Sequence, residues 1–207
     1  MKTSVVDHPL AAQLLTRLRD KHTDRAVFRQ AVEELSVMLL FEATRGLVSE
    51  AVTVETPLGP AVGSRIVDTP LVVPILRAGL GMLGAVLRVM PGTETGFIGV
   101  ARNESSFQPE PYMNAVPDQL HGRQVLVLDP MLATGGSLEH ACRILAARGA
   151  GHLTAVVVLA APEGLDRLAH SGLDLEVWTA AIDERLNEQA YIVPGLGDAG
   201  DRLFGTA

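Results

Sequence analysis

Residues 125–137 read VLVLDPMLATGGS and decide the fold. The first four are aliphatic with no polar face, which is typical of a parallel strand covered on both sides. Asp129 follows at the carboxyl end of this strand, the end where ligands bind in open α/β sheets. Thr134 then begins a predicted helix that runs to Arg148, with Gly149 at its C-cap. The stretch therefore predicts an α/β protein with a ligand site at this edge of its sheet.

The turn at residues 134–137 has the composition of a phosphate-binding loop. Gly135 and Gly136 permit close approach and unusual φ angles, and the flanking hydroxyls of Thr134 and Ser137 add donors. The N-terminus of the following helix presents free N–H groups and favours negative charge, so a phosphate monoester fits. The carboxylate of Asp129 can accept hydrogen bonds from ribose hydroxyls nearby. The stretch as a whole predicts a site for a phosphorylated sugar.

The same residues resemble the phosphoribosyl diphosphate (PRPP) loop of type I phosphoribosyltransferases. Most of that superfamily carries a second acid after the first, whereas Pro130 stands here, followed by Met131 and Leu132, as in the uracil phosphoribosyltransferase branch. The resemblance implies a single domain over residues 1–207, with a mostly parallel central sheet flanked by helices, a protruding β-arm and a C-terminal hood. It implies PRPP contacts at Asp129, Pro130, Met131, Leu132, Ala133, Thr134, Gly135, Gly136 and Ser137.

Composition limits the classes of function. The chain has 207 residues, enough for one well-filled α/β core, and its net charge of −7 argues against a nucleic-acid partner. Lys2 and Lys21 are the only lysines among 17 basic residues, so phosphate contacts must come from arginines and backbone amides. The sequence GxxxxGK[ST] is absent, which excludes a P-loop NTPase. Cys142 is the only cysteine and is expected to be buried in the predicted helix.

The sequence predicts a cytoplasmic protein with no membrane partner. Asp7, His8 and Pro9 stand where a signal peptide needs an apolar core, and no uninterrupted apolar run approaches about 18 residues. The six histidines are scattered without ligand spacing, so neither a zinc site nor a catalytic triad is predicted.

Hydrophobic periodicity predicts the elements around the central stretch. Residues 9–20 and 24–45 read as helices, the second with Asp24 as its N-cap and Gly46 at its end. Residues 51–58 alternate in polarity before a turn, which predicts one strand of an arm, and in the resembling family an arm at about residues 51–69 lies at a dimer interface. Further strands are predicted at residues 71–76, 97–101, 153–160, 175–178 and 191–193, and a short helix at residues 162–170.

A second glycine motif allows a different function. Gly79, Gly81 and Gly84 spell GxGxxG between a predicted strand and a helix, the context of a dinucleotide site. Such a site should carry an acid about twenty residues later, whereas the next predicted strand ends in Arg102, which leaves an NADP-binding protein as an alternative. In the resembling family this loop receives pyrophosphate, with Arg77 beside it and Arg102 reaching in from the next strand. Arginine suits that role because its guanidinium can bond two phosphate oxygens at once.

Residues 103–118 are polar and rich in proline, which predicts a mobile loop that closes over the substrate. The sequence departs from the resembling family here. Ala101 stands where an aromatic residue usually precedes the arginine, Asn103 replaces a common aspartate, and Met113 replaces a frequent tyrosine. These departures leave open how the loop packs and how tightly PRPP binds.

The C-terminal stretch AIDERLNEQAYIVPGLGDAGDRLFG indicates which base is bound. Residues 194–200 read as an irregular loop able to present main-chain groups to a flat heterocycle, and uracil needs both donors and acceptors along one edge. The resemblance carries base recognition to the Ile192 main chain and to Gly197, Asp198 and Ala199, within a hood at about residues 179–207. It also puts Asp198 near PRPP and near Mg²⁺, which is held mainly through PRPP.

These features predict an enzyme of the uracil phosphoribosyltransferase branch, which transfers phosphoribosyl from PRPP to N1 of uracil for pyrimidine salvage. Its predicted catalytic residues are Arg77, Arg102, Asp129 and Asp198, and the arginines and Mg²⁺ would bind the leaving group more tightly as charge develops. The resemblance implies a homo-oligomer, and a dimer or tetramer and activation by GTP stay open. The alternative from another class is a PRPP- or nucleotide-sensing regulator on the same fold, which would show a basic face.

Overall fold

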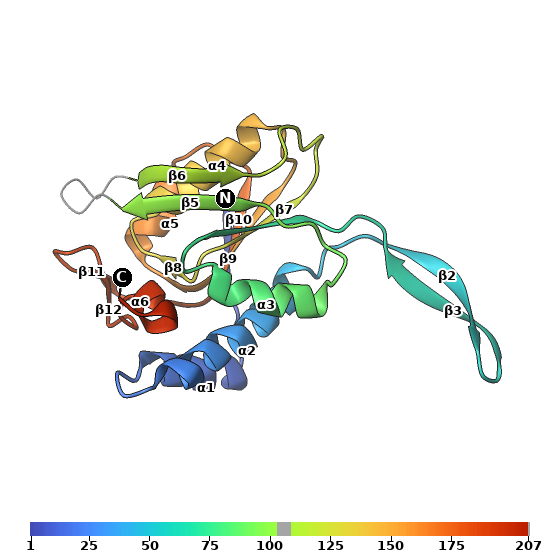
Figure 1. The fold of residues 1–207 in the computed structure, drawn as a ribbon, viewed down its shortest axis with the longest axis horizontal. Helices are drawn as coiled ribbons and strands as arrows, with labels where there is room; N and C mark the ends of the chain where they lie inside the picture. The colour runs from blue at the N-terminus through green and yellow to red at the C-terminus, as the bar shows by residue number, and fades with distance from the viewer. Residues whose placement is uncertain (103–108, 207) are drawn as a thin grey trace.

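A mostly parallel β-sheet runs through the centre of the molecule, with helices on both faces (Figure 1). The computed structural model describes residues 1–102 and 109–206. In this part the central sheet has the strand order β1-β10-β9-β7-β4-β5-β6, with β8 paired to β9, and within this sheet only β5 and β6 pair antiparallel. The strands are β1 (Lys2–Val5), β4 (Leu71–Leu76), β5 (Phe97–Arg102), β6 (Pro109–Ala115), β7 (Val125–Leu128), β8 (Met131–Leu132), β9 (Leu153–Ala160) and β10 (Leu175–Ile182).

The central strands are parallel because both of their faces are covered. Every residue of β7 and β9 is buried, which leaves no polar face for water and confirms the expected α/β class. Three helices cover one face of the sheet and two cover the other (Figure 1). The first group is α1 (Pro9–Arg19), α2 (Arg25–Ala43) and α3 (Leu80–Val89), and the second is α4 (Gly136–Ala147) and α5 (Pro162–Ala169).

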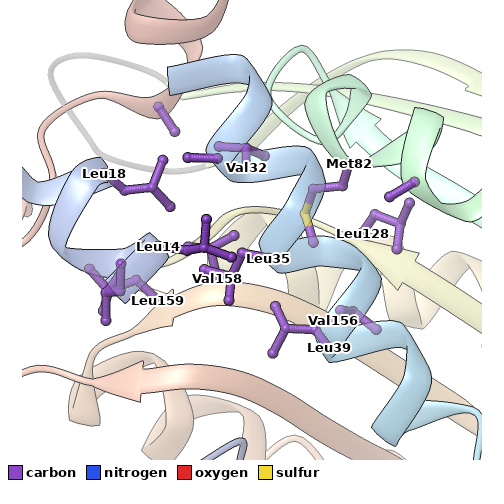
Figure 2. Packing of buried hydrophobic residues seen from close by; sticks show 14 of the residues in the cluster. Leu14, Leu18, Val32, Leu35, Leu39, Met82, Leu128, Val156, Val158 and Leu159 are labelled. Carbon is purple, nitrogen blue, oxygen red and sulfur yellow. The ribbon is translucent and has the colours of Figure 1, made fainter. Parts of the chain in front are cut away.

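Aliphatic side chains of α1 and α2 form the larger core against the sheet. Leu18, Leu35 and Leu39 are fully buried, and each such leucine stabilises the fold by about 1.5–3 kcal/mol. Figure 2 shows these side chains meeting residues of the sheet and of α3, among them Met82, Leu128, Val156, Val158 and Leu159. This packing fixes the carboxyl ends of the strands relative to α1 and α3.

Several elements differ from the sequence-based expectation. The helix α2 ends at Ala43, and Thr44 rather than Gly46 is its C-cap, because the Thr44 hydroxyl donates to the Leu40 carbonyl at 2.7 Å. The strand β10 continues past Trp178 to Ile182, since Ala181 and Ile182 still pair with β9. The short strand β1 was not predicted. Its four residues, Lys2–Val5, mix polar and apolar side chains without a pattern, and only their pairing with β10 shows that they form a strand.

Part of the predicted mobile loop at residues 103–118 is a strand. Residues 109–115 form β6, antiparallel to β5, so the prediction of a loop was wrong there. Prolines do not prevent this, because β6 is the edge strand and needs hydrogen bonds on one side only. Residues 103–108, including Asn103, lie outside the described part of the chain.

Two appendages extend from the central sheet. The hairpin of β2 (Ser49–Thr56) and β3 (Gly59–Ile66) projects away from the body, and the strand predicted at residues 51–58 lies largely in β2 (Figure 1). At the other end, β11 (Arg185–Leu186), β12 (Ile192–Val193) and α6 (Ala199–Phe204) lie together (Figure 1). Among the described residues, no helix has both the length and the apolar character needed to cross a bilayer.

Candidate active site

A cavity of about 290 Å³ opens at the carboxyl ends of β4 and β7. It brings together Arg77, which follows β4, Asp129, which follows β7, and Asp198 from the C-terminal segment. Many residues expected to contact PRPP therefore line one cavity, although Arg77 and Asp198 are 121 positions apart in the sequence. The lining also includes Met131, Leu132, Ala133, Thr134, Gly135, Gly136, Ser137 and Ala199.

The glycine turn before α4 leaves a helix N-terminus open to this cavity. Gly135 has a φ of +77°, and a Cβ there would lie 2.9 Å from the Gly164 carbonyl oxygen, so glycine is required by both conformation and space. Within the described residues, no side chain caps the start of α4. The first N–H groups of a helix have no helical acceptor, so these donors are available to an anion.

Asp129 and Pro130 connect this cavity to the centre of the sheet. The Asp129 side chain is half-buried, and its Oδ1 accepts from the Met131 N–H at 3.4 Å. Pro130 does not line the cavity, because it is buried and its carbonyl accepts the N–H groups of Val158 and Leu159, both at 3.0 Å. The Asp129 carboxylate thus lines the cavity, while Pro130 links this segment to β9 through main-chain hydrogen bonds.

The motif GxGxxG has a packing explanation. A Cβ at Gly79 would lie 2.4 Å from the Leu128 carbonyl oxygen, and one at Gly81 would lie 2.7 Å from the Leu203 side chain. A Cβ at Gly84 would meet the Glu33 carboxylate at 2.8 Å. Packing therefore requires glycine at position 79, where the close atoms belong to the backbone, and favours it at positions 81 and 84, where they belong to side chains, so a dinucleotide is not needed to explain the motif.

Arg77 precedes this glycine motif and lies between the sheet and the C-terminal segment. The Leu76–Arg77 peptide bond is cis. The Arg77 guanidinium lies 3.8 Å from the Asp201 carboxylate on α6, and both side chains are about half exposed. An exposed pair of this length contributes little stability, so Arg77 can exchange Asp201 for another anion at small cost.

A second cavity, of about 630 Å³, adjoins the first and shares Arg77, Met131 and Asp198 with it. The residues expected to bind uracil all line it, and these are Ile192, Gly197, Asp198 and Ala199. Asp198 is also the N-cap of α6, and its Oδ1 accepts from the Asp201 N–H at 2.8 Å. This hydrogen bond fixes the carboxylate where the two cavities meet.

The loop at residues 194–198 is held by charged residues that were not among the site residues predicted from the sequence. The Asp183 carboxylate accepts the Gly195 N–H at 2.8 Å, and Arg19 donates to the Gly195 carbonyl at 2.9 Å. Arg202 donates to the Leu196 carbonyl at 2.8 Å and to the Leu18 carbonyl. The only signal for Asp183 and Arg202 was their place in the C-terminal stretch, and nothing in the sequence marked Arg19.

Burial affects the ionisation of two groups outside the lining of these cavities. Desolvation lowers the pKa of the Arg202 guanidinium, which lies 4.1 Å from the centre of the Phe28 ring. Cys142 is buried as predicted, and desolvation raises the pKa of its thiol to about 12. A thiol in that state is neutral at physiological pH and inert as a nucleophile.

An ion-pair cluster around the partly buried Glu139 lies one turn along α4 from the glycine turn. The Glu139 carboxylate accepts from Arg167 Nε and from Arg143 Nη2, each at 2.6 Å, and its side chain is only 13% exposed. The hydrogen bond from Arg167, with that from Arg143, lowers the pKa of Glu139. The two arginines neutralise a carboxylate that would otherwise repel an anion bound at the turn.

Some predicted features lie beyond what the structure describes. The backbone of Arg102 ends β5, but its side chain and that of Ala101 are outside the described part. Met113 lies on β6 and is 40% exposed. Because the Arg102 side chain is outside the described part, its expected reach toward the cavity stays a prediction.

Comparison with known proteins identifies the family. The family model "Uracil phosphoribosyltransferase" matches residues 5–206. A uracil phosphoribosyltransferase from Corynebacterium diphtheriae is 54% identical over 205 residues, which are 99% of this chain and 97% of the relative. A solved protein from Aquifex aeolicus is 38% identical, with a TM-score of 0.92 and coverage of 99% of both chains.

A more distant solved structure bears on the fold alone. A hypoxanthine-guanine phosphoribosyltransferase from Bacillus anthracis is 12% identical, with a TM-score of 0.53 over 77% of this chain and 80% of its own. The expected type I phosphoribosyltransferase fold is thereby confirmed. The chain belongs to the uracil phosphoribosyltransferase family.

Proposed function

We propose that the chain transfers the phosphoribosyl group of PRPP to N1 of uracil and releases UMP and diphosphate. The observation that carries the proposal is the junction of two cavities, one lined by a phosphate-type turn and the other by the C-terminal loop, which share Arg77 and Asp198. A sugar phosphate in the first cavity and a base in the second would bring their reacting atoms to this junction. The family to which the chain belongs carries the same activity in its name.

PRPP would occupy the first cavity along its length. Its 5′-phosphate would accept N–H groups from the turn at residues 134–137, where the helix α4 favours negative charge. Asp129 would accept from the ribose hydroxyls. The diphosphate would lie near Arg77, with Arg102 as its second cation.

The chain's own residues would act mainly by electrostatic positioning. As the bond from C1 to the diphosphate breaks and the bond to uracil N1 forms, the N1 proton would pass to the released diphosphate or to solvent. Negative charge grows on the leaving group, and Arg77 would bind it more tightly than in the ground state. Its weak pair with Asp201 leaves it free to do so. The second cavity would exclude water from C1 and hold the base in line, so no protein nucleophile is required.

Mg²⁺ fits this donor set as a partner of PRPP. Among residues 1–102 and 109–206, no group of three or more acidic, histidine or cysteine side chains could hold a metal. Mg²⁺ commonly binds through one or two carboxylates plus substrate phosphates, and Asp198 offers a carboxylate at the cavity. When bound, the ion would neutralise charge on the diphosphate.

We also infer that the chain forms a homo-oligomer through its arm. The hairpin β2–β3 exposes Leu58 completely and Val62 by 79%, and an isolated two-stranded hairpin is only marginally stable in water. Pairing with a second copy would cover these side chains. Replacing residues 49–66 with a short turn should shift the mass in analytical ultracentrifugation to a single chain, and an unchanged mass would contradict the inference.

The activity is tested by incubating the chain with PRPP, Mg²⁺ and uracil and measuring UMP. UMP and diphosphate should form in equal amounts, and no product should form when PRPP is omitted. Adenine and hypoxanthine are the controls for base choice. Product from a purine at a rate like that of uracil, or no UMP at all, would contradict the proposal.

A further inference from the structure

Arg19 and Asp183 form a bidentate ion pair behind the C-terminal loop. Arg19 is the last residue of α1, and Asp183 follows β10. Arg19 Nη2 lies 2.5 Å from Asp183 Oδ1, and Arg19 Nη1 lies 2.8 Å from Oδ2. The Asp183 side chain is only 4% exposed and that of Arg19 27% exposed. Neither residue lines the two cavities described above.

The Arg19–Asp183 pair forms hydrogen bonds with both main-chain groups of one residue, Gly195. The Gly195 N–H donates to Asp183 Oδ2 at 2.8 Å, and the Gly195 carbonyl accepts from Arg19 Nη1 at 2.9 Å. Hydrogen bonds to charged groups are stronger than neutral ones, and these two act on the donor and the acceptor of the same residue. The orientation of Gly195 is therefore set by side chains from two distant parts of the chain.

Gly195 controls the spacing of the residues that line the second cavity. It lies between Ile192 on one side and Gly197 and Ala199 on the other, which are parts of that lining. Its φ is +66°, and a Cβ would lie 2.1 Å from the Ile192 carbonyl oxygen, so the turn is very tight. A rotation of this turn would move the main chain of Ile192 relative to that of Gly197.

We propose that Arg19 and Asp183 are positioning residues that fix the main-chain edge against which the base is read, an inference that rests on the proposed function. A flat base is recognised by hydrogen bonds whose partners must hold their spacing closely. A buried ion pair is a poor source of stability, because desolvation offsets much of its attraction. The two hydrogen bonds to Gly195 indicate that this pair holds the main chain of the loop in one orientation rather than adding stability.

The kinetic test uses Arg19→Gln, Arg19→Lys and Asp183→Asn in the full chain. The KM for uracil should rise at least about tenfold in Arg19→Gln and in Asp183→Asn, while the KM for PRPP stays within about twofold. Arg19→Lys keeps a cation that can reach the carboxylate, so it should recover part of the loss. The double variant Arg19→Gln/Asp183→Asn should resemble each single variant, because both remove one unit.

Two further measurements separate positioning from general destabilisation. Hydrogen exchange of peptides covering residues 191–198 should be faster in Arg19→Gln, with exchange in β7 and β9 unchanged. The matched control is Arg123→Gln, since the Arg123 side chain is 29% exposed and pairs with Glu94, away from both cavities. This control should leave the KM for uracil and the exchange of the loop unaltered.

The outcomes distinguish this inference from the proposed function. Absence of UMP with the unaltered chain would overturn the proposed function and the inference together. UMP formation by the unaltered chain, with an unchanged KM for uracil in folded Arg19→Gln, would overturn the inference alone. Equal increases in the KM for uracil and for PRPP would also overturn it, because the effect would not be confined to the base.

Discussion

The two loops that meet at the cavities are held in different ways. The glycine turn at residues 134–137 is fixed by its own strand, β7 with β8, and by its own helix, α4, with Gly164 as a close neighbour. The loop at residues 194–198 has short elements on both sides and is held by Arg19, Asp183 and Arg202. The first loop is held mainly by the strand and helix next to it in sequence, whereas the second depends on residues far along the chain.

This difference separates two kinds of vulnerability. A change within the glycine turn should abolish anion binding and leave the fold intact, because the strand and helix around it stand without it. A change that affects the second loop can act from a distance, through α1 or through the end of β10.

The largest effect is expected for Gly135→Val. The branched side chain would meet the Gly164 carbonyl and would need a left-handed φ that valine rarely adopts. PRPP binding should weaken by at least about a thousandfold, because the turn would have to leave the conformation that presents its N–H groups to the phosphate. Titration calorimetry measures it, and circular dichroism should show that α4 persists.

The matched control for that variant is Gly172→Val. Gly172 has nearly the same φ, +76°, but a Cβ there meets nothing within 4 Å, so it reproduces the backbone strain away from the cavities. PRPP affinity should be unchanged in this variant. Normal PRPP affinity in folded Gly135→Val would show that the turn does not bind the phosphate.

The second effect concerns the base. If main-chain groups around residues 192–199 read uracil, cytosine should be poorer by at least about a hundredfold, because two reversed contacts leave buried polar groups unpaired. 5-Fluorouracil keeps the same hydrogen-bonding edge and should react about as well as uracil. Competition assays with saturating PRPP measure the ratios, and efficient use of cytosine would contradict reading by peptide groups.

The third effect is on stability. Arg202→Ala removes hydrogen bonds to the Leu18, Asp20 and Leu196 carbonyls and the contact with the Phe28 ring. The free energy of unfolding should fall by about 2–3 kcal/mol, since the carbonyls of the buried residues Leu18 and Leu196 lose a charged donor. Urea denaturation gives the value. Arg88→Ala is the comparison, because the Arg88 side chain is 66% exposed and pairs with the Glu33 carboxylate at the surface, and this change should cost less than about 1 kcal/mol.

The smallest effect is a pH dependence at the glycine turn. Because Arg167 and Arg143 lower the pKa of Glu139 in the folded chain, its contribution to stability is complete above the unfolded value of about 4.3. That contribution is lost as the pH falls through the lower folded pKa. Glu139→Gln should therefore cost about 1 kcal/mol at pH 7 and progressively less in acid. Urea midpoints measured from pH 7 to pH 3 test this, and a constant difference would contradict it.

Contiguity in the chain explains what could be predicted. The strand, acid and glycines of residues 125–137 lie together, so pattern alone indicated a phosphate site and an α/β fold. The contact of Arg19 with the C-terminal loop could not be predicted, because its partners Asp183 and Gly195 are 164 and 176 positions away in the sequence. The strand β6 was missed because proline argues against strands unless the edge position is known, and that position is a property of the whole sheet.

The prolines of β6 also bear on solubility. Pro109 and Pro111 pair with Arg102 and Val100 of β5, so they lie two residues apart and share one side of the edge strand. A strand from another molecule that approached this edge would find no N–H group at either position. Sheets of different molecules join through backbone hydrogen bonds between exposed edge strands. The edge strand β6 lacks two of the N–H donors that such hydrogen bonds need. The same residues that obscured the strand in the sequence therefore protect the folded chain against edge-to-edge aggregation.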